Sequence, residues 1–302
     1  MTIAIRRIAA TACLLAGVAF CHQANATGLI GASLLTQQHP FYIQLAQAMQ
    51  DEAKKDKVTL QVSIANQDLN KQIADVEDFI TKKVDVIIIS PVDSSGVRGA
   101  IRAAKRAGIQ VITVDVPAQH AEVASHIGTD NYTGGEKAGD LMAQQLGDTG
   151  QVGIIDYPTV QSVVDRINGF RHALESHPNM KIVADQAGIT RAEALSVAQN
   201  MLQANPDITG IFGFGDDAAL AAASAVHGAN RVGKVKVIGF DGMQEAITAV
   251  DHDPVFVGVI RQYPDKMGAT AIDTAVALMA KQPVQAKQLI VPGVYTKTSA
   301  AH

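Results

Sequence analysis

The sequence predicts an α/β protein of two doubly wound lobes, each built on a parallel sheet. Two observations lead to this fold. Short apolar runs rich in β-branched residues alternate with amphipathic segments that have helical spacing, and this alternation occurs once in each half of the chain. Strands that are apolar along nearly their whole length are typical of parallel sheets with helices on both faces.

Each half contains four predicted strands. They cover residues 28–35, 58–64, 84–90 and 109–115, and then 151–156, 180–187, 208–214 and 235–241. Helices are predicted where apolar residues recur every three or four positions: Phe41, Leu45, Met49; Val163, Ile167, Phe170; Ala194, Ala198, Met201. Two capping boxes, Ser162 with Asp165 and Thr190 with Glu193, predict where two helices of the second half begin.

The first 26 residues have the pattern of an export signal. Arg6 and Arg7 precede a short apolar stretch over residues 8–20, and small residues at Ala24 and Ala26 provide a cleavage site. The apolar stretch is too short to span a bilayer. We therefore expect cleavage after Ala26 and a soluble, monomeric protein in the periplasm.

The composition excludes several classes of function. Both cysteines, Cys13 and Cys21, precede the expected cleavage site, so disulfides and thiolate chemistry are excluded from the mature chain. Without Arg6 and Arg7, 23 basic residues stand against 29 acidic ones, a formal charge of −6 that does not attract nucleic acid. Motifs for zinc, for a P-loop and for a nucleophile elbow are missing from the sequence, and we expect neither a cofactor nor a metal nor a catalytic set.

One glycine motif favours a different class of protein. Residues 213–218 match the spacing of the dinucleotide fingerprint. Asp216 and Asp217, however, would place two carboxylates where a pyrophosphate needs bare N–H donors. We interpret these glycines as aids to close packing of a helix on a strand.

Ligands of open α/β sheets bind beyond the carboxyl ends of the strands. The residues at these positions are His39, Phe41, Tyr42, Ser90, Asp115, Tyr157, Ile189, Gly215 and Asp241. Arg166 belongs to the same rim, because it lies in the first turns of the helix expected after Ser162. Aromatic rings, carboxylates and one guanidinium together suit a neutral polyhydroxylated molecule.

The chain resembles the periplasmic sugar-binding proteins of the ribose-binding type, which share their fold with the effector domains of LacI-type repressors. The resemblance is carried by HPFY at 39–42, SPVD at 90–93, ITVD at 112–115, SHIGTDNYTGG at 125–135, DRINGF at 165–170, GFDG at 239–242 and QYPDKMG at 262–268. It implies hinge closure around a small carbohydrate and delivery to an ABC permease. It also implies one lobe of residues 27–129 with 263–290, a second lobe of residues 130–262 with 291–302, and three crossings between them.

The resemblance assigns roles to individual side chains. Phe41 and Tyr42 become the aromatic wall of the first lobe, Asp115 and Asp241 accept hydrogen bonds from ligand hydroxyls, and Arg166 donates to them. Gln262 becomes a contact from a hinge strand.

Five positions depart from the pentose-binding pattern. Val116 stands in place of an Arg, His39 and Ser90 in place of Asn, Ile189 in place of an aromatic residue and Gly215 in place of an Asn. Loss of hydroxyl contacts changes which sugar a site accepts. We hypothesise a pocket that is roomier or less polar on one side, with Tyr157 or Phe214 in place of the lost aromatic ring.

Simpler structural roles compete with these assignments. One of Phe41 and Tyr42 is expected in the core, since adjacent helical positions face different ways, and Asp115 and Asp241 could cap helices. Gln262 could serve only the hinge backbone. Ser90 and His39 could be turn residues with solvated side chains.

Alternatives also remain for the function. A secreted carbohydrate-active enzyme would need a carboxylate pair, for which Asp115 and Asp241 are the candidates. A sensory protein that presents its ligand to a chemoreceptor or sensor kinase would use the same site with a different partner. The ligand itself stays open among pentoses, other monosaccharides, sugar alcohols and non-sugar molecules.

Overall fold

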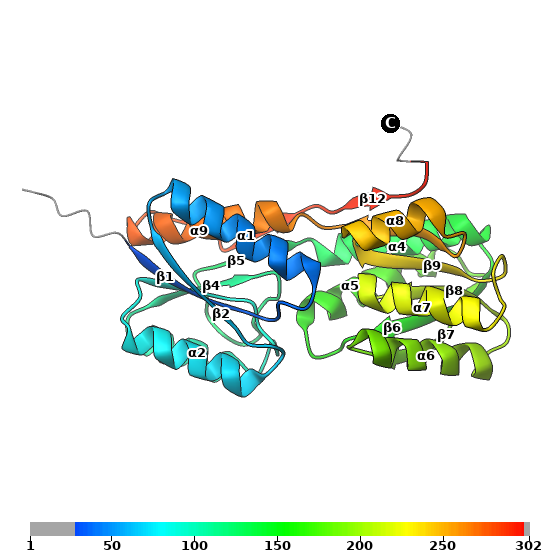
Figure 1. Cartoon of the computed structure of the whole chain (residues 1–302), viewed down its shortest axis with the longest axis horizontal. Coiled ribbons are helices and arrows are strands. Elements are labelled where there is room, and N and C mark those ends of the chain that lie inside the picture. Colours follow the sequence, from blue (N-terminus) through cyan, green and yellow to red (C-terminus); the bar gives the residue numbers. More distant parts are fainter. Residues whose placement is uncertain (1–27, 299–302) are drawn as a thin grey trace, which may run out of the picture.

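The protein consists of two α/β lobes that lie end to end (Figure 1). The computed structural model describes residues 28–298. The expected export signal, its cleavage site after Ala26 and both cysteines lie outside the described residues. Within residues 28–298, every helix is too short or too polar to cross a membrane.

The first lobe is built on a six-stranded sheet in the order β11-β5-β4-β3-β1-β2. All neighbouring strands in it are parallel. Its strands are β1 (Leu29–Leu34), β2 (Thr59–Ile64), β3 (Val86–Ile89), β4 (Gln110–Val114), β5 (Ser125–Thr129) and β11 (Lys287–Ile290).

The second lobe repeats this order as β12-β10-β9-β8-β6-β7. Its strands are β6 (Gly150–Asp156), β7 (Met180–Ala187), β8 (Ile208–Gly213), β9 (Lys236–Asp241), β10 (Phe256–Arg261) and β12 (Gly293–Tyr295). Only its edge strand β12 runs antiparallel to its neighbour among these strands. The two doubly wound sheets predicted from the sequence are therefore confirmed.

Helices cover both faces of each sheet, as near-continuous apolar strands require. In the first lobe α1 and α9 pack on one face and α2 and α3 on the other; in the second, α4 and α5 pack on one face and α6, α7 and α8 on the other. Their bounds are α1 (Pro40–Lys55), α2 (Leu69–Thr81), α3 (Arg98–Arg106), α4 (Asn131–Leu146), α5 (Gln161–Glu175), α6 (Arg191–Ala204), α7 (Asp216–Gly228), α8 (Gln244–His252) and α9 (Pro264–Met279).

The prediction of four strands in each half was incomplete. Each sheet has a fifth strand, β5 or β10, and an edge strand from the end of the chain. In β5 the polar residues His126 and Thr129 interrupt the apolar pattern, although the whole strand is buried. The edge strands β11 and β12 are short and half exposed, so they have little apolar pattern to detect.

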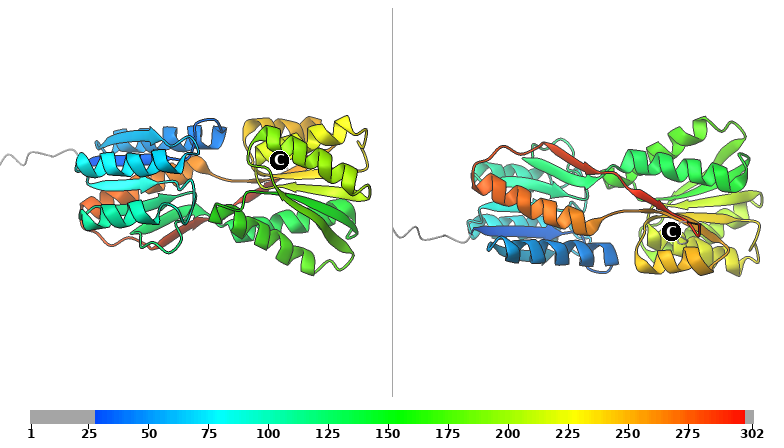
Figure 2. Two further views of the ribbon diagram at one scale, coloured as in Figure 1. Left: turned by 90° about the horizontal axis from the view of Figure 1, so that it is seen from below. Right: turned by 90° about the horizontal axis from the view of Figure 1, so that it is seen from above.

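Three segments connect the lobes, and Figure 2 shows them passing between the two halves of the molecule. They join β5 to α4, β10 to α9 and β11 to β12. The carboxyl ends of the parallel strands in both lobes face each other near these connections, and the space between them is where a ligand is expected.

The pair α4 and α5 packs unusually closely because glycines meet backbone at the contact. A side chain at Gly135 would overlap the backbone carbonyl of Arg166, and one at Gly169 would overlap that of Tyr132. The close approach therefore sets the position of α5, the helix that carries Arg166.

We predict that Gly135→Ala lowers the free energy of unfolding by about 2–3 kcal/mol, since the added methyl group must push the two helices apart. Urea unfolding followed by circular dichroism measures the effect. Gly99→Ala in α3 is the matched control: its new methyl group meets open space, so it should be neutral or stabilising by up to about 1 kcal/mol. Equal effects of the two substitutions would contradict the packing argument.

Candidate functional site: a cleft between the lobes

A cavity of about 450 Å³ lies between the two lobes. Its walls come from residues that follow the carboxyl ends of strands in both sheets. It brings together eleven of the twelve residues predicted as site residues: His39, Phe41, Tyr42, Asp115, Tyr157, Arg166, Ile189, Phe214, Gly215, Asp241 and Gln262.

The start of α1 forms one wall of the cavity. Pro40 begins the helix and His39 caps it, with Nδ1 of the imidazole accepting a hydrogen bond from the Phe41 N–H at 3.2 Å. In the neutral ring the proton is therefore on Nε2, which lies 3.5 Å from Asp241 Oδ2 in the other lobe. His39 thus reaches across the cleft while it holds the aromatic residues that follow it.

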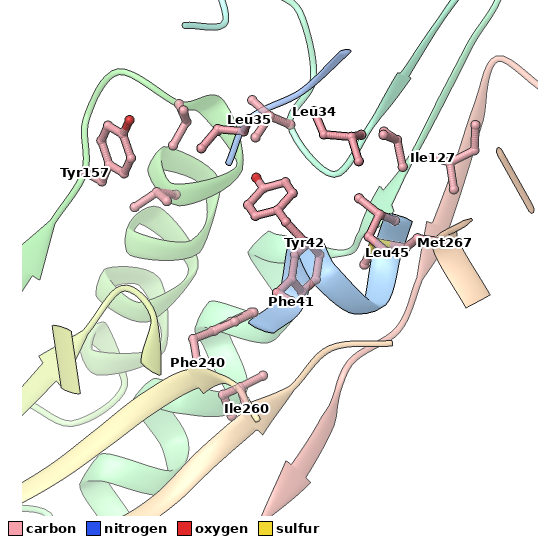
Figure 3. Packing of buried hydrophobic residues seen from close by; sticks show 14 of the residues in the cluster. Leu34, Leu35, Phe41, Tyr42, Leu45, Ile127, Tyr157, Phe240, Ile260 and Met267 are labelled. Atoms are coloured by element: carbon pink, nitrogen blue, oxygen red, sulfur yellow. The ribbon is translucent and has the colours of Figure 1, made fainter. Parts of the chain in front are cut away.

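Phe41 and Tyr42 both line the cavity and both are buried. Their rings pack edge to face with centroids 5.1 Å apart. The expectation that only one of the two faces the cleft was wrong, because the first turn of α1 projects into the cavity. Figure 3 shows both rings on α1, with Tyr157 at the far side before α5.

Tyr42 is anchored by Asp115. Its hydroxyl donates to Asp115 Oδ2 at 2.5 Å and accepts from Ser90 Oγ at 3.4 Å. Ser90 is fully buried and lies behind Tyr42 rather than on the cavity wall. The structure therefore corrects both interpretations of Ser90, as a cavity-lining residue and as a solvated turn residue.

Asp115 and Asp241 hold equivalent places in the two lobes, at the ends of β4 and β9. Both have positive backbone φ angles, 65° and 106° respectively, which are strained for residues with a side chain. Neither is the cap of a described helix, since the cap of α8 is Met243. The strained backbone instead turns both carboxylates into the cavity.

Arg166 on α5 is the one cation buried in the described part of the cavity wall, with 4 % of its surface exposed. Nε and one terminal nitrogen donate to Asn131 Oδ1 at 3.3 and 2.8 Å. The other terminal nitrogen donates to the Phe214 carbonyl and lies 3.7 Å from Asp241 Oδ1. The guanidinium also stacks on the Phe240 ring, 3.4 Å from its centroid.

Gln262 connects the hinge to the cavity. Its amide donates to Asp241 Oδ1 at 2.6 Å and its oxygen accepts from Thr129 Oγ1 at 2.5 Å. Its backbone N–H donates to the Asp241 carbonyl at 2.8 Å. The side chain therefore contacts the hinge residue Thr129 and also lines the cavity, and its role as a ligand contact stays a prediction.

Burial dominates the electrostatics of the cluster. It raises the pKa of Asp115 from 3.8 to about 6, although hydrogen bonding from Tyr42 and the charge of Arg166 oppose the rise. Burial and the neighbouring Asp115 raise the pKa of Tyr42 well above its usual value. Burial lowers the pKa of Arg166, against the attraction of Asp241 and Asp115, but a guanidinium stays charged at neutral pH.

Part of the lining is apolar, and it comes from both lobes. It comprises Leu35, Val116, Val160, Val163, Ile189, Tyr157 and Phe214. Tyr157 and Phe214 pack edge to face with centroids 5.6 Å apart. Polar groups that could hold hydroxyls are found around Arg166, while these seven residues offer mainly hydrophobic contact.

The sequence and the fold are similar to those of proteins of known class. A family model described as periplasmic binding protein domain matches residues 30–283. The chain belongs to this family. Its members are solute-binding proteins, and the family places the protein in the periplasm.

Three similar proteins align with nearly the whole of this chain. The ribose import binding protein RbsB of Haemophilus influenzae is 32% identical over 280 residues, which cover 92% of this chain and 95% of the relative. A solute-binding protein of Actinobacillus succinogenes, solved with bound D-allose, has a TM-score of 0.85 and 32% identity and covers 91% and 99% of the two chains. A solute-binding protein from Mycobacterium smegmatis, solved with bound glycerol, has a TM-score of 0.86 and 36% identity. The match covers 91% of this chain and 96% of that chain.

The sequence missed a charged cluster at the rim of the binding protein's cleft. Arg191 on α6 binds Glu245 through both terminal nitrogens, at 2.9 and 2.7 Å, and its Nε donates to Asp217 at 2.8 Å. All three residues line the cavity. Arg191 follows the correctly predicted capping box of Thr190 and Glu193, but its partners come from α7 and α8, far away in the sequence.

The other predicted capping box was wrong. The helix α5 begins at Gln161 with Val160 as its cap residue, and Ser162 lies within the first turn. Ser162 is buried and lines the cavity. In the glycine motif, Gly213 allows close packing, because a side chain there would overlap the backbone of α7. Gly215 instead faces Asp241.

We predict that Asp115→Asn stabilises the ligand-free protein at pH 8. Because the folded pKa is raised to about 6, the contribution of Asp115 to stability is full below pH 3.8 and is lost as the pH rises through about 6. The neutral Asn avoids this loss, so the free energy of unfolding at pH 8 should rise by about 1–3 kcal/mol.

Urea unfolding of the wild type and the variant at pH 4 and pH 8 measures this difference. Asp207→Asn is the control, since Asp207 is exposed in the turn before β8 and its replacement should change stability little at either pH. A gain from Asp115→Asn that is as large at pH 4 as at pH 8 would contradict the assignment.

Proposed function

We propose that this protein is exported to the periplasm, captures a small carbohydrate or polyol between its lobes and delivers it to an ABC permease. The observation that carries the proposal is the cluster of Asp115, Arg166, Asp241 and Gln262 in one cavity beside the rings of Phe41 and Tyr42. Acceptors and donors at close spacing suit neighbouring hydroxyls, and aromatic rings cover C–H faces. The related proteins named for ribose import and solved with D-allose support this class of ligand.

The ligand is proposed to be larger or less polar on one side than a pentose. The cavity of about 450 Å³ lies within the range of pockets that hold small-molecule ligands. The side chains of Val116 and Ile189 in the lining offer hydrophobic contact rather than hydrogen bonds. A monosaccharide or sugar alcohol with an apolar face or substituent directed at these residues fits this arrangement.

Closure is proposed to be a hinge motion of two rigid lobes. The first comprises residues 27–129 with 263–290 and the second residues 130–262 with 291–302. The three connecting segments would then bend near Thr129 to Asp130, Arg261 to Gln262 and Ile290 to Val291. Export after cleavage at Ala26 would deliver this form to the periplasm.

We predict that a thermal-shift screen of sugars and polyols finds ligands that raise the melting temperature of the mature protein, since a ligand bound only by the folded state stabilises it by mass action. D-Ribose should be a weak ligand, because its polar side would face Val116 and Ile189. Ribose binding with submicromolar affinity by calorimetry would contradict the proposed pocket. A broad panel without any ligand would contradict the carbohydrate assignment.

Two further assays separate the alternatives for the same site. Hydrolysis of chromogenic glycosides by the purified protein would favour a carbohydrate-active enzyme that uses Asp115 and Asp241. Co-purification with a receptor ectodomain instead of permease subunits would favour a sensory role.

We predict that Asp241→Asn weakens binding of the best ligand from that screen by about 10- to 100-fold, since hydrogen bonds to charged groups contribute about 1.5–3 kcal/mol. Calorimetric titration at pH 7.5 measures the affinity. Asp265→Asn, at an exposed position in the first turn of α9, is the control and should bind as the wild type does. An affinity within twofold of wild type for Asp241→Asn would remove Asp241 from the site.

A further inference from the structure

The helix α5 begins at the cleft without a capping side chain of its own. Its cap residue is Val160, whose apolar side chain offers no acceptor to the first N–H groups of the helix. The hydroxyl of Ser94, in the other lobe, occupies that role: Ser94 Oγ accepts from the Gln161 N–H at 2.9 Å. The cap of α5 is therefore supplied across the cleft.

The contact is reciprocal and buried. The backbone N–H of Ser94 donates to the Thr159 carbonyl at 3.3 Å, so two hydrogen bonds of opposite direction join the lobes at one residue. Only 3% of Ser94 is exposed. Gln119, which is hydrogen-bonded to Ser94 in the first lobe, donates a side-chain hydrogen bond to Gln161 Oε1. We call these contacts of Ser94 and Gln119 with the start of α5 the seam at Ser94.

Hydrogen bonds within the first lobe fix the loop around Ser94. Asp93 accepts hydrogen bonds from the backbone N–H groups of Ser95 and Gly96 at 2.8 and 2.6 Å. The Ser94 carbonyl accepts from the Gln119 N–H at 2.7 Å. The Ser94 hydroxyl is thus presented to α5 by a fixed turn and need not be ordered during closure.

The helix that receives this cap carries much of the site. Val160, Ser162, Val163 and Arg166 all lie at its start and line the cavity. When the lobes separate, Ser94 leaves and water must take over the Gln161 N–H. The satisfaction of the first N–H of α5, beside the lining residues Val160 and Ser162, is then linked to whether the cleft is closed.

We infer that Ser94 is a positioning residue for ligand capture: it caps α5 from the opposite lobe only in the closed form, and so favours closure and sets the start of the helix that holds Arg166. This inference rests on the proposed closure of the lobes but not on the identity of the ligand. Loss of a capping hydroxyl shifts an equilibrium by about fivefold.

The test measures closure without a ligand. In protein expressed from residue 27, which has no natural cysteine, Asn70→Cys and Ala192→Cys place one thiol on each side of the cleft. Both positions are exposed, at the starts of α2 and α6, and the nearby Gln67 and Arg191 line the cavity from opposite lobes. A short bis-maleimide then joins the two thiols only when the lobes come together.

The initial cross-linking rate, divided by the modification rates of the single-cysteine variants, reports the closed fraction even when it is small. In this background Ser94→Ala should lower the ratio of closed to open protein about fivefold. Ser94→Thr, which keeps the hydroxyl, should restore it. Ser224→Ala should not change it, because that exposed hydroxyl on α7 bonds the Leu220 carbonyl of its own helix.

Several results would overturn the inference: an unchanged ratio in Ser94→Ala, an equal loss in Ser94→Thr or Ser224→Ala, or no cross-linking in the background protein. The outcome is separate from that of the proposed function. A protein that passes this test but binds no sugar or polyol would refute the carbohydrate ligand and keep the role of Ser94. A protein that binds a sugar but fails the test would do the reverse.

Discussion

The buried guanidinium of Arg166 is the interaction on which the cleft depends. A cation taken out of water costs several kcal/mol unless acceptors surround it. Arg166 has such acceptors on three elements: Asn131 at the start of α4, the Phe214 carbonyl after β8 and Asp241 at the end of β9. One side chain therefore holds together a helix that follows a hinge segment and two strand ends. The carboxylates face the cavity because this charge must be balanced there.

That balance also explains the strain in the backbone. Burial raises the pKa of Asp115, and repulsion from Asp241 adds to the rise. Together they outweigh the opposing charge of Arg166. Their positive φ angles cost free energy that the rest of each lobe must offset. A fold needing only stability would avoid two strained, mutually repelling carboxylates. Their equivalent positions at the ends of β4 and β9 support the proposal that both contact one ligand, each from its own lobe.

The sequence predicted what local patterns encode. Strands with apolar runs, the helix stripe through Val163 and Phe170, and polar residues at strand ends located both lobes and most of the cavity wall. It failed where a contact joins distant segments. Ser162 has the local pattern of a cap, yet the cap position of α5 is Val160, two residues earlier, and the capping hydroxyl comes from Ser94. Ser90 follows β3 as a ligand residue would, but Tyr42 covers it. Neither outcome is visible without tertiary packing.

The polar contacts between the lobes are few outside the hinge segments. Within residues 28–298, those across the cleft away from the hinge are the contacts of Ser94 and Gln119 with the start of α5 and that of His39 with Asp241. Neutral hydrogen bonds contribute about 0.5–1.5 kcal/mol each. A ligand that fills the cavity and bonds to Asp115, Asp241 and Arg166 contributes more, since those groups are charged. The seam at Ser94 therefore sets how easily the lobes close, while the differential affinity for ligand determines which form prevails.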